Sequence, residues 1–311
     1  MTSTGTSRLR GMPPWDDKER AVLLALMGER PQAAWSALVA DVIEAGNAAA
    51  VWATRHERTL FDPDPPEPIA EAARQLAKWR ATGLDVHTFR DPSYPAQLRE
   101  IHQLPPVLFS RGNLLANERA VSVVGSRRAS DPALAWTRKL AETLVSAGIT
   151  VVSGLATGID TTAHWATLEA GGRTVAVLGT GINRAYPAAN RGLQDRIERE
   201  GLVLSQFWPD DPPTRTSFPI RNATMSGYGQ VTVVVEAGEA SGARIQARVG
   251  VEHGRPVILT DAVVRGNEWA KVLRHRPGVY VVSSTDEVLD LVAALRPDLD
   301  DVLNDLLAAG G

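Results

Sequence analysis

The segment VVSGLATGIDTTAHWA brings Ser153, Asp160 and His164 together between glycines, and these are the side-chain types of a hydrolytic triad. Such a triad needs its serine on an exposed elbow, with the histidine within hydrogen-bond reach. The G-x-S-x-G elbow is missing around Ser153, whereas Asp160 stands directly before a helical pattern, where an aspartate caps the first turn. We therefore expect Asp160 to be a helix N-cap, His164 to be an orienting or packing residue, and neither to be catalytic.

Glycine-containing turns follow four of the short apolar runs between residues 121 and 260, and arginines recur in these segments. Glycines let backbone N–H groups approach an anion, helix N-termini add positive potential, and guanidinium groups bind phosphate oxygens in pairs. The pattern predicts a site for a polyanion or a nucleotide. The turn residues expected to bind are Gly125, Ser126, Arg127, Arg128, Ser153, Gly154, Gly158, Gly179 and Gly181. The other arginines of these segments are Arg184, Arg191, Arg215, Arg221 and Arg244.

Two common nucleotide-binding signatures are absent from the sequence. The first strand of the expected core is followed by GSRRAS instead of G-x-G-x-x-G, and no G-x-x-x-x-G-K-[ST] phosphate loop occurs. The chain has no cysteine, and its six histidines are scattered, which gives no support to a cysteine- or histidine-based metal site. We expect neither a metal nor a cofactor.

The net charge of −3 argues only weakly against a nucleic-acid partner, because the charge is unevenly distributed. Residues 121–260 carry fourteen Lys and Arg against twelve Asp and Glu, whereas residues 285–311 carry one Arg against seven Asp and Glu. An acidic end therefore masks a mildly basic middle. There is no run of eighteen apolar residues and no apolar core of a signal peptide, so we expect a cytoplasmic protein without a membrane partner.

The apolar pattern predicts four parts of the chain. We expect a disordered leader at 1–14, a helical N-terminal domain with a Pro-rich linker at 15–83, a Rossmann-like core at 84–284, and an acidic C-terminal helix or tail at 285–311.

Within the core, short apolar runs without alternation, typical of strands covered on both faces, alternate with amphipathic helices. This order predicts an α/β fold with an extended Rossmann-like, doubly wound, mostly parallel sheet. One helix is expected to begin at an N-cap, Asp131, and residues 206–222 are expected to form a loop. VYVV at 279–282 predicts one further strand.

The order of the motifs resembles the DprA/Smf family of DNA-processing proteins, over about Phe89 to Val257. The segments that carry the resemblance are VLFSRGNL, VSVVGSRRAS, VVSGLATGID, LEAGGRTVAVLGTG, YP followed by N, FPIRN, VVVEA and SGA. The resemblance implies a non-enzymatic, dimeric protein that binds single-stranded DNA. It also implies that the protein assists a RecA-type recombinase to load onto incoming strands in natural transformation and recombination.

The resemblance also implies a set of binding residues. These are Arg127 of the GSR turn, Tyr186 and Asn190 of the YP…N loop with Arg191 beside them, and Phe218, Arg221 and Asn222 of the FPxRN motif. Tyr186, Trp208 and Phe218 lie in the same loops, where aromatic rings can stack on bases or pack within the loops. The family usually has a second arginine where this chain has Ala223, which predicts a divergent member with altered affinity.

Two other classes of function stay open. One is a nucleotide-binding Rossmann-like enzyme or sensor, similar to nucleoside monophosphate phosphoribohydrolases, with Glu236 as its acid/base candidate. The other is an interaction module that does not bind DNA and uses its acidic C-terminal segment to dock a partner.

Overall fold

The computed structural model of the chain describes residues 15–56 and 66–295. The predicted leader at 1–14, most of the Pro-rich linker and the last part of the acidic segment lie outside the described residues.

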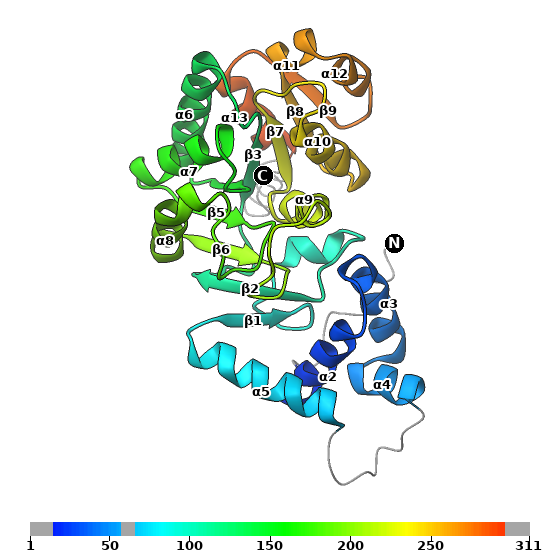
Figure 1. The fold of residues 1–311 in the computed structure, drawn as a ribbon. Helices are drawn as coiled ribbons and strands as arrows, with labels where there is room; N and C mark the ends of the chain where they lie inside the picture. The colour runs from blue at the N-terminus through cyan, green and yellow to red at the C-terminus, as the bar shows by residue number, and fades with distance from the viewer. Residues whose placement is uncertain (1–14, 57–65, 296–311) are drawn as a thin grey trace, which may run out of the picture.

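In the described residues, nine strands form one sheet in the order β1-β2-β6-β5-β4-β3-β7-β8-β9 (Figure 1). The strands from β6 to β9 in this order are parallel, whereas β2 is antiparallel to both β1 and β6 at one edge. The predicted fold class, a doubly wound and mostly parallel α/β sheet, is confirmed. The strands are β1 (Asp85–Thr88), β2 (Val107–Gly112), β3 (Ala120–Val124), β4 (Thr150–Ser153), β5 (Thr174–Val177), β6 (Leu202–Ser205), β7 (Val231–Val234), β8 (Val257–Thr260) and β9 (Val279–Val282).

Helices cover both faces of the sheet (Figure 1). One face packs against α6, α7 and α13 through a cluster of buried valine, leucine and isoleucine side chains, and the other face carries α9 and α10. Because β3 to β8 are buried along their whole length, their mostly apolar composition without alternation is the one expected of strands covered on both sides. The helices of the core are α6 (Asp131–Ser146), α7 (Ile159–Glu169), α8 (Arg191–Glu200), α9 (Ser217–Tyr228), α10 (Gly242–Glu252), α11 (Asp261–Gly266), α12 (Glu268–Leu273) and α13 (Thr285–Leu295).

The expectation of a loop over residues 206–222 was wrong at its end, because α9 begins at Ser217. Pro219 lies in the first turn, where its missing N–H removes no intrahelical hydrogen bond. The first turn is further held by the Ser217 backbone N–H, which donates to Thr214 Oγ1 at 3.0 Å. The FPIRN motif therefore stands on the start of a helix. The antiparallel strands β1 and β2 were also not foreseen.

The start of α6 differs by one residue from the prediction. Its N-cap is Ser130, whose Oγ accepts a hydrogen bond from the Ala133 backbone N–H at 3.4 Å, and Asp131 is the first helical residue. Serine fills the same capping role as aspartate, and the acidic side chain still favours the positive helix end.

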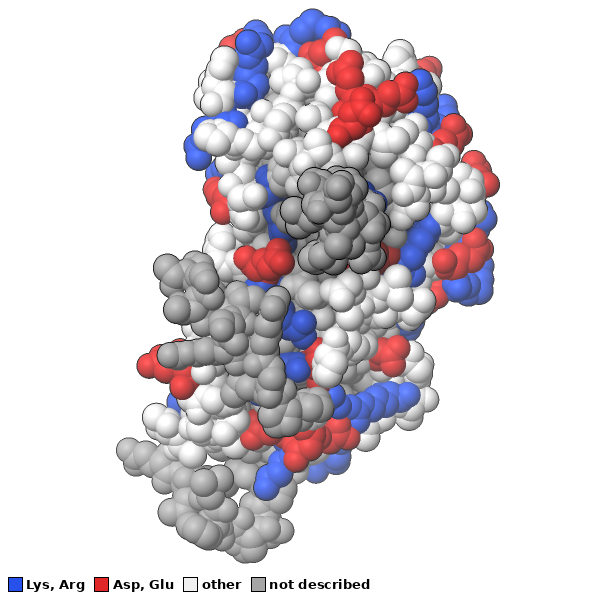
Figure 2. Space-filling view, turned by 180° about the vertical axis from the view of Figure 1, so that it is seen from behind, with Lys and Arg blue, Asp and Glu red and all other residues white. Residues whose placement is uncertain are grey.

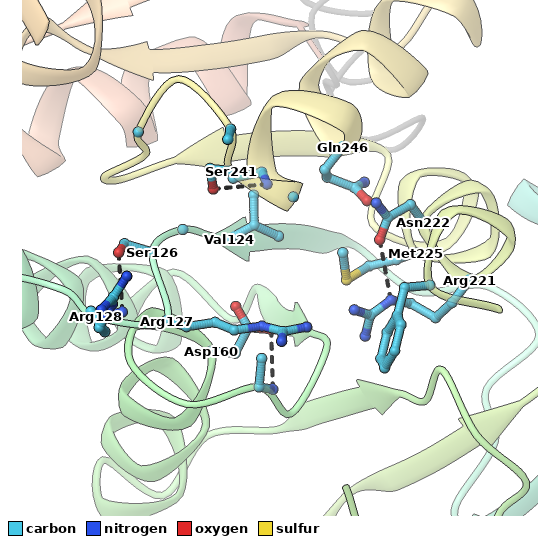
Figure 3. Close-up of a pocket in the computed structure, with 17 residues that line it drawn as sticks. Val124, Ser126, Arg127, Arg128, Asp160, Arg221, Asn222, Met225, Ser241 and Gln246 are labelled. Carbon is cyan, nitrogen blue, oxygen red and sulfur yellow. Dashed lines mark hydrogen bonds between the residues drawn. The ribbon is translucent and has the colours of Figure 1, made fainter. Parts of the chain in front are cut away.

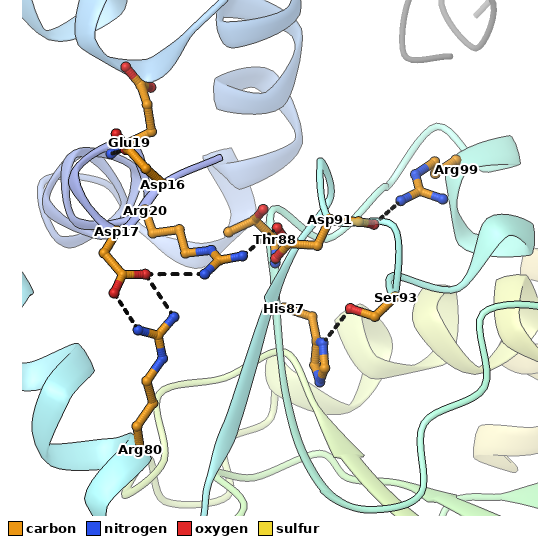
Figure 4. Close-up of polar contacts among 10 residues, drawn as sticks. All are labelled: Asp16, Asp17, Glu19, Arg20, Arg80, His87, Thr88, Asp91, Ser93 and Arg99. Atoms are coloured by element: carbon orange, nitrogen blue, oxygen red, sulfur yellow. Dashed lines mark hydrogen bonds and ion pairs between the residues drawn. The ribbon is translucent and has the colours of Figure 1, made fainter. Parts of the chain in front are cut away.

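The N-terminal helices α2 (Asp17–Gly28), α3 (Trp35–Ala45), α4 (Ala48–His56) and α5 (Glu67–Ala81) pack beside the β1 edge of the sheet (Figure 1). Arg20 donates to Asp91 at 2.7 Å, and Arg80 donates to Asp17 at 2.6 Å, so α2 is tied both to α5 and to the turn after β1 (Figure 4). The buried side chains of these helices belong to the same hydrophobic cluster as those of β1 and β2. The division of the chain into domains stays a prediction.

Two further observations concern the surface. Among the helices of residues 15–56 and 66–295, none has the length and apolarity that a membrane crossing requires. Seen from behind, acidic and basic side chains are interspersed over the described part of the surface, without a broad basic field (Figure 2).

Candidate nucleic-acid interface

A cavity of about 500 Å³ lies at the carboxyl ends of β3 and β7 (Figure 3). These strands are neighbours, but the chain continues from β3 toward β4 on one side and from β7 toward β8 on the other. In open α/β sheets, ligands bind where the strand order reverses in this way. The cavity is lined by the turn after β3, the starts of α7, α9 and α10, and the loop before α10.

Arg127 and Arg128 stand on the turn after β3 at the cavity, and both are exposed. Within the described residues, neither guanidinium forms a hydrogen bond or an ion pair with the protein. The Arg127 guanidinium carbon lies 5.6 Å from the ring centroid of Phe218. Both cations are therefore available to an external anion, and Arg127 is also fixed beside an aromatic ring.

Gly158 allows the turn before α7 to pack against the turn after β3. Its φ is +80°, and a Cβ at this position would collide with the carbonyl oxygen of Ser126. That oxygen accepts a hydrogen bond from the Ile159 backbone N–H at 3.2 Å. Gly125 packs just as closely, since a Cβ there would lie 2.5 Å from Ile159 Cγ1. These glycines position the arginine turn by close backbone packing.

The prediction that Asp160 caps α7 was wrong, because the N-cap is Gly158 and Asp160 lies within the first turn. Its Oδ2 instead accepts hydrogen bonds from the backbone N–H groups of Gly154 at 3.1 Å and Ala156 at 3.3 Å. Burial raises the pKa of this carboxyl, and the nearby Arg221 acts in the opposite direction. Asp160 therefore shapes the turn after β4, an orienting role.

Ser153 and His164 are both fully buried, and each side chain forms a hydrogen bond with another part of the protein. The Ser153 hydroxyl donates to the carbonyl oxygen of Val123 at 2.6 Å, so the expected contact of this side chain with a phosphate does not fit the structure. His164 Nδ1 lies 2.7 Å from Thr174 Oγ1, and burial, with a smaller effect of Arg221, lowers the pKa of the imidazole to about 3. The segment does not form a hydrolytic triad.

Arg221 is buried, and it connects the start of α9 to the ends of two strands. Its Nη1 donates to the carbonyl oxygens of Gly154 at 2.8 Å and Val177 at 2.7 Å, and its Nε donates to Asn222 Oδ1 at 3.2 Å. Burial lowers the pKa of this guanidinium, while Asp160 raises it. A Cβ on Gly154 would collide with the guanidinium, so this glycine makes room for it.

Phe218 lines the cavity and contacts both Arg127 and Tyr186. Its ring centroid is 5.6 Å from that of Tyr186, which is 42% exposed. A Cβ on Gly179 would lie 2.6 Å from Phe218 Cδ1, so this glycine leaves space for the ring. Because Tyr186 is exposed and Phe218 is partly exposed, the pair offers a stacking surface close to Arg127, whose guanidinium has no hydrogen bond or ion pair among the described residues.

Other predicted residues hold the surrounding loops. Asn190 is buried, and its Nδ2 donates to Leu155 O and to Thr161 Oγ1, each at 2.8 Å. Arg191 donates to the carbonyl oxygen of Asn183 at 3.1 Å and does not line the cavity.

Gly181 and Trp208 belong to the same packed region of loops. A Cβ on Gly181 would collide with the Trp208 carbonyl oxygen. The Trp208 ring packs against Trp35 of α3, Trp79 of α5 and Phe109 of β2, with centroids 5.7 to 6.1 Å apart, so it joins this loop to the N-terminal helices and the sheet edge and is not a site for bases.

The helix α10 was expected from the sequence, but none of its residues that line the cavity was named as a binding residue. Ser241, Gly242, Ala243 and Gln246 line the cavity, with Ser241 as the N-cap of the helix. The serine followed by a helical pattern was a usable signal for the helix start. No signal in the sequence marked Gln246, because its place in the cavity depends on how α10 packs against α9.

Glu236 was the candidate acid/base of the alternative enzyme. Both of its carboxylate oxygens accept hydrogen bonds from the Ser130 backbone N–H, at 3.1 and 3.2 Å, and Oε2 also accepts from the Ser130 hydroxyl. The carboxylate thus holds the loop before α6. Because both of its oxygens already accept hydrogen bonds from Ser130, the structure does not favour Glu236 as a catalytic acid or base. In the described ranges, no group of three or more His, Asp or Glu side chains is placed to hold a metal ion.

Comparison with known proteins identifies the family of the chain. Residues 85–293 match the model of the family described as DNA recombination-mediator protein A. Protein Smf of Synechocystis is 44% identical over 172 residues, which are 54% of this chain and 43% of that protein. The DNA processing protein DprA of Streptococcus pneumoniae is 43% identical over 201 residues, which are 64% of this chain and 71% of that protein. The chain thus spans less than half the length of the Synechocystis relative.

Solved structures extend the likeness to most of the chain. The X-ray structure of DprA from Streptococcus pneumoniae has a TM-score of 0.67 at 29% identity, covering 89% of this chain and 98% of that chain. A structure of DprA from Helicobacter pylori, described by its single-stranded DNA binding mode, shares the fold with a TM-score of 0.60 at 22% identity, covering 68% and 96% of the two chains. On the family match, the sequence relatives and the shared fold, this chain belongs to the DNA recombination-mediator protein A family, the family of DprA and Smf.

Proposed function

We propose that this protein is a DNA-processing protein that binds single-stranded DNA along the carboxyl edge of its sheet. The observation that carries the proposal is the Arg127 guanidinium, which has no hydrogen bond or ion pair among the described residues and lies 5.6 Å from the ring centroid of Phe218, a ring that also contacts the exposed Tyr186. Cations for phosphates and flat rings for bases are the two components of single-strand binding surfaces. The name of the pneumococcal relative and the single-stranded DNA named for the Helicobacter protein support the choice of ligand.

Within this proposal, the residues have different roles. Arg127 and Arg128 attract the phosphates, and Tyr186 and Phe218 stack on bases. The first turn of α10 adds backbone N–H groups and the positive end of a helix dipole to the same cavity. Arg221, Asn190, Asp160 and His164 hold the surrounding turns, and the function is binding without catalytic turnover.

We further propose that the bound strand is passed to a RecA-type recombinase, as in natural transformation and homologous recombination, and that the protein acts as a homodimer. These two statements rest on family membership. Light scattering of the purified protein tests the dimer. Recombinase loading on a strand covered by single-strand binding protein, measured with and without this protein, tests the transfer.

The experiment that tests strand binding is a fluorescence-anisotropy titration of single- and double-stranded oligonucleotides of equal length. Because phosphate contacts release counterions, we expect binding at low salt that weakens steeply as salt is raised. Because stacking needs unpaired bases, we expect the single strand to bind more tightly than the duplex. Absence of binding to a long single strand at low salt would refute the proposal.

A further inference from the structure

Glu236, just after β7, holds the far end of the arginine turn, residues 125–130. Its carboxylate oxygens accept from the Ser130 backbone N–H at 3.1 and 3.2 Å, and Oε2 also accepts from the Ser130 hydroxyl. Among the described residues, the hydrogen bonds between this turn and distant parts of the chain lie at its two ends. Near the first end, Ser126 O accepts from the Ile159 backbone N–H at 3.2 Å, and at the second end Ser130 donates to Glu236.

The two segments that this carboxylate joins diverge from neighbouring strands. The Val235 backbone N–H donates to Val124 O at 3.0 Å, which extends the pairing of β7 with β3 to their carboxyl ends. Beyond this pair, the chain continues into the arginine turn on one side and into the loop before α10 on the other, and both segments contribute to the cavity. Glu236 is the first residue after the pair, so its side chain connects the two segments where they separate.

The charge and the hydrogen bonds of Glu236 have opposite effects on a bound polyanion. Ser130 is the N-cap of α6, so the carboxylate accepts its hydrogen bonds at the positive end of a helix dipole, where a negative charge is stabilised. The same charge repels phosphates that bind nearby. Its hydrogen bonds, in contrast, hold the turn that carries Arg127, one of the cations that a strand would contact. The two effects can therefore be separated by experiment.

We propose that Glu236 is a positioning residue of the strand-binding site. It fixes the arginine turn at Ser130, so that Arg127 stays beside Phe218 and meets a phosphate in an ordered conformation. Without this anchor, the turn has more conformations in the free protein, and ordering them on binding lowers the affinity. Within the described residues, no ion pair joins Glu236 to Arg127, so Glu236 acts through the backbone of the turn. This inference rests on the proposed binding of single-stranded DNA.

Three substitutions separate the charge of Glu236 from its hydrogen bonds. Glu236→Gln removes the charge and keeps the length, and its amide can still accept from the Ser130 N–H and donate to the Ser130 hydroxyl oxygen. Glu236→Asp keeps the charge but is one methylene shorter. Glu236→Ala removes both the charge and the hydrogen bonds. If only the charge mattered, Glu236→Gln and Glu236→Ala would both bind a strand more tightly than the wild type, and Glu236→Asp would bind like the wild type.

Anisotropy titrations with oligothymidylate at several salt concentrations measure the affinities. We expect Glu236→Gln to bind at least as tightly as the wild type, and Glu236→Asp and Glu236→Ala to bind roughly two- to tenfold more weakly, the effect of one lost hydrogen bond. In these two variants, the slope of log affinity against log salt should fall by up to about 0.7, because the contact of Arg127 with a phosphate is weakened. Urea unfolding identifies the conditions in which the variants are folded. Glu236→Gln and Glu236→Asp decide the question if Glu236→Ala does not fold.

A double-mutant cycle tests whether Glu236 acts through Arg127. We expect Glu236→Asp to weaken binding by the wild type and to have a much smaller effect on Arg127→Ala, because the arginine to be positioned is missing. Glu287→Asp is the matched control. Glu287 Oε2 accepts from the Ser283 backbone N–H at 2.9 Å before α13, but Glu287 does not line the cavity, so this variant should keep the affinity of the wild type.

Four results would overturn the inference. Glu236→Asp and Glu236→Ala bind as tightly as the wild type, or Glu236→Gln and Glu236→Ala bind more tightly by the same factor. In the third result, Glu236→Asp has the same effect with and without Arg127, and in the fourth, Glu287→Asp weakens binding as much as Glu236→Asp does. Each of these results refutes the positioning role and leaves strand binding standing. Absence of binding by the wild type at low salt refutes strand binding itself and the positioning role with it.

Discussion

At the scale of single residues, two arginines of the cavity have different roles. Arg127 is exposed and has no partner among the described residues, whereas Arg221 is buried and uses Nη1 and Nε for three hydrogen bonds within the protein. The sequence predicted both as phosphate ligands. The sequence alone does not distinguish the exposed Arg127 from the buried Arg221, because the carbonyl groups that accept from Arg221 lie 67 and 44 positions away along the chain.

Arg221→Ala therefore tests a structural role. The change removes the donors to Gly154 O and Val177 O inside the protein, so we expect the free energy of unfolding to fall by about 2–5 kcal/mol. Arg127→Ala removes no internal hydrogen bond and should change that free energy by no more than about 0.5 kcal/mol. Urea unfolding of both variants measures the difference. Wild-type stability of Arg221→Ala would contradict this assignment.

Burial also predicts how stability depends on pH. The pKa values of His164 and His253 are lowered by burial to about 3 and about 4, whereas unfolded histidine has its ordinary value of 6.5. As the pH falls below 6.5, the unfolded state binds protons that the folded state does not, so stability is lost toward pH 4. The loss approaches about 1.4 kcal/mol per pH unit for the fully buried His164, and it is smaller for the partly exposed His253, where solvent screens the effect.

Urea unfolding at pH 7, 6 and 5 measures this dependence. The raised pKa of Asp160 acts in the opposite sense, because protonation of this buried carboxyl favours the folded state. His253→Gln should make the dependence less steep. A stability that stays constant or increases between pH 7 and 5 would contradict the assignment of His164 and His253 as neutral in the folded state.

At the scale of elements, the site is built from turns that pack closely against one another. The apolar runs and amphipathic segments were sufficient to predict the parallel strands and most helices of the core. They failed for α9, because proline and polar residues around Ser217 have the composition of a loop, and only their packing places Phe218 and Arg221 on a helix. The glycines were recognised as important, but the sequence suggested contacts with phosphate. In the structure, Gly154, Gly158 and Gly179 make room for neighbouring groups of the protein.

Gly158→Ala tests this role, with Gly171→Ala as the matched control. Both glycines have positive φ, +80° and +72°, but a Cβ at Gly158 would collide with Ser126 O, whereas a Cβ at Gly171 has no atom within 4 Å. We expect Gly171→Ala to cost about 1–2 kcal/mol of unfolding free energy, and Gly158→Ala to cost about 1–3 kcal/mol more. Gly158→Ala should also weaken strand binding, since the arginine turn must move. Equal stability of the two variants would show that this turn is not tightly packed.

At the scale of the whole molecule, the reversal of strand order between β3 and β7 creates the site. The loops that follow these two strands diverge there, and the cavity between them collects side chains from α7, α9 and α10. The sequence predicted the doubly wound sheet and therefore the edge on which a ligand binds. It did not give the strand order, so it did not indicate that α10 faces Arg127 across one cavity.

The central claim is that the strand lies at the cavity beside Arg127, and the salt dependence of binding tests it most directly. Arg138 on α6 is the matched control, because it is exposed, has no partner among the described residues and does not line the cavity. Affinity for a single strand is measured at several salt concentrations for the wild type, Arg127→Ala and Arg138→Ala. We expect Arg127→Ala alone to lower the affinity and to reduce the slope of log affinity against log salt by about 0.7. If both variants lower the affinity equally, or if Arg138→Ala alone lowers it, the claim that the strand lies beside Arg127 is contradicted.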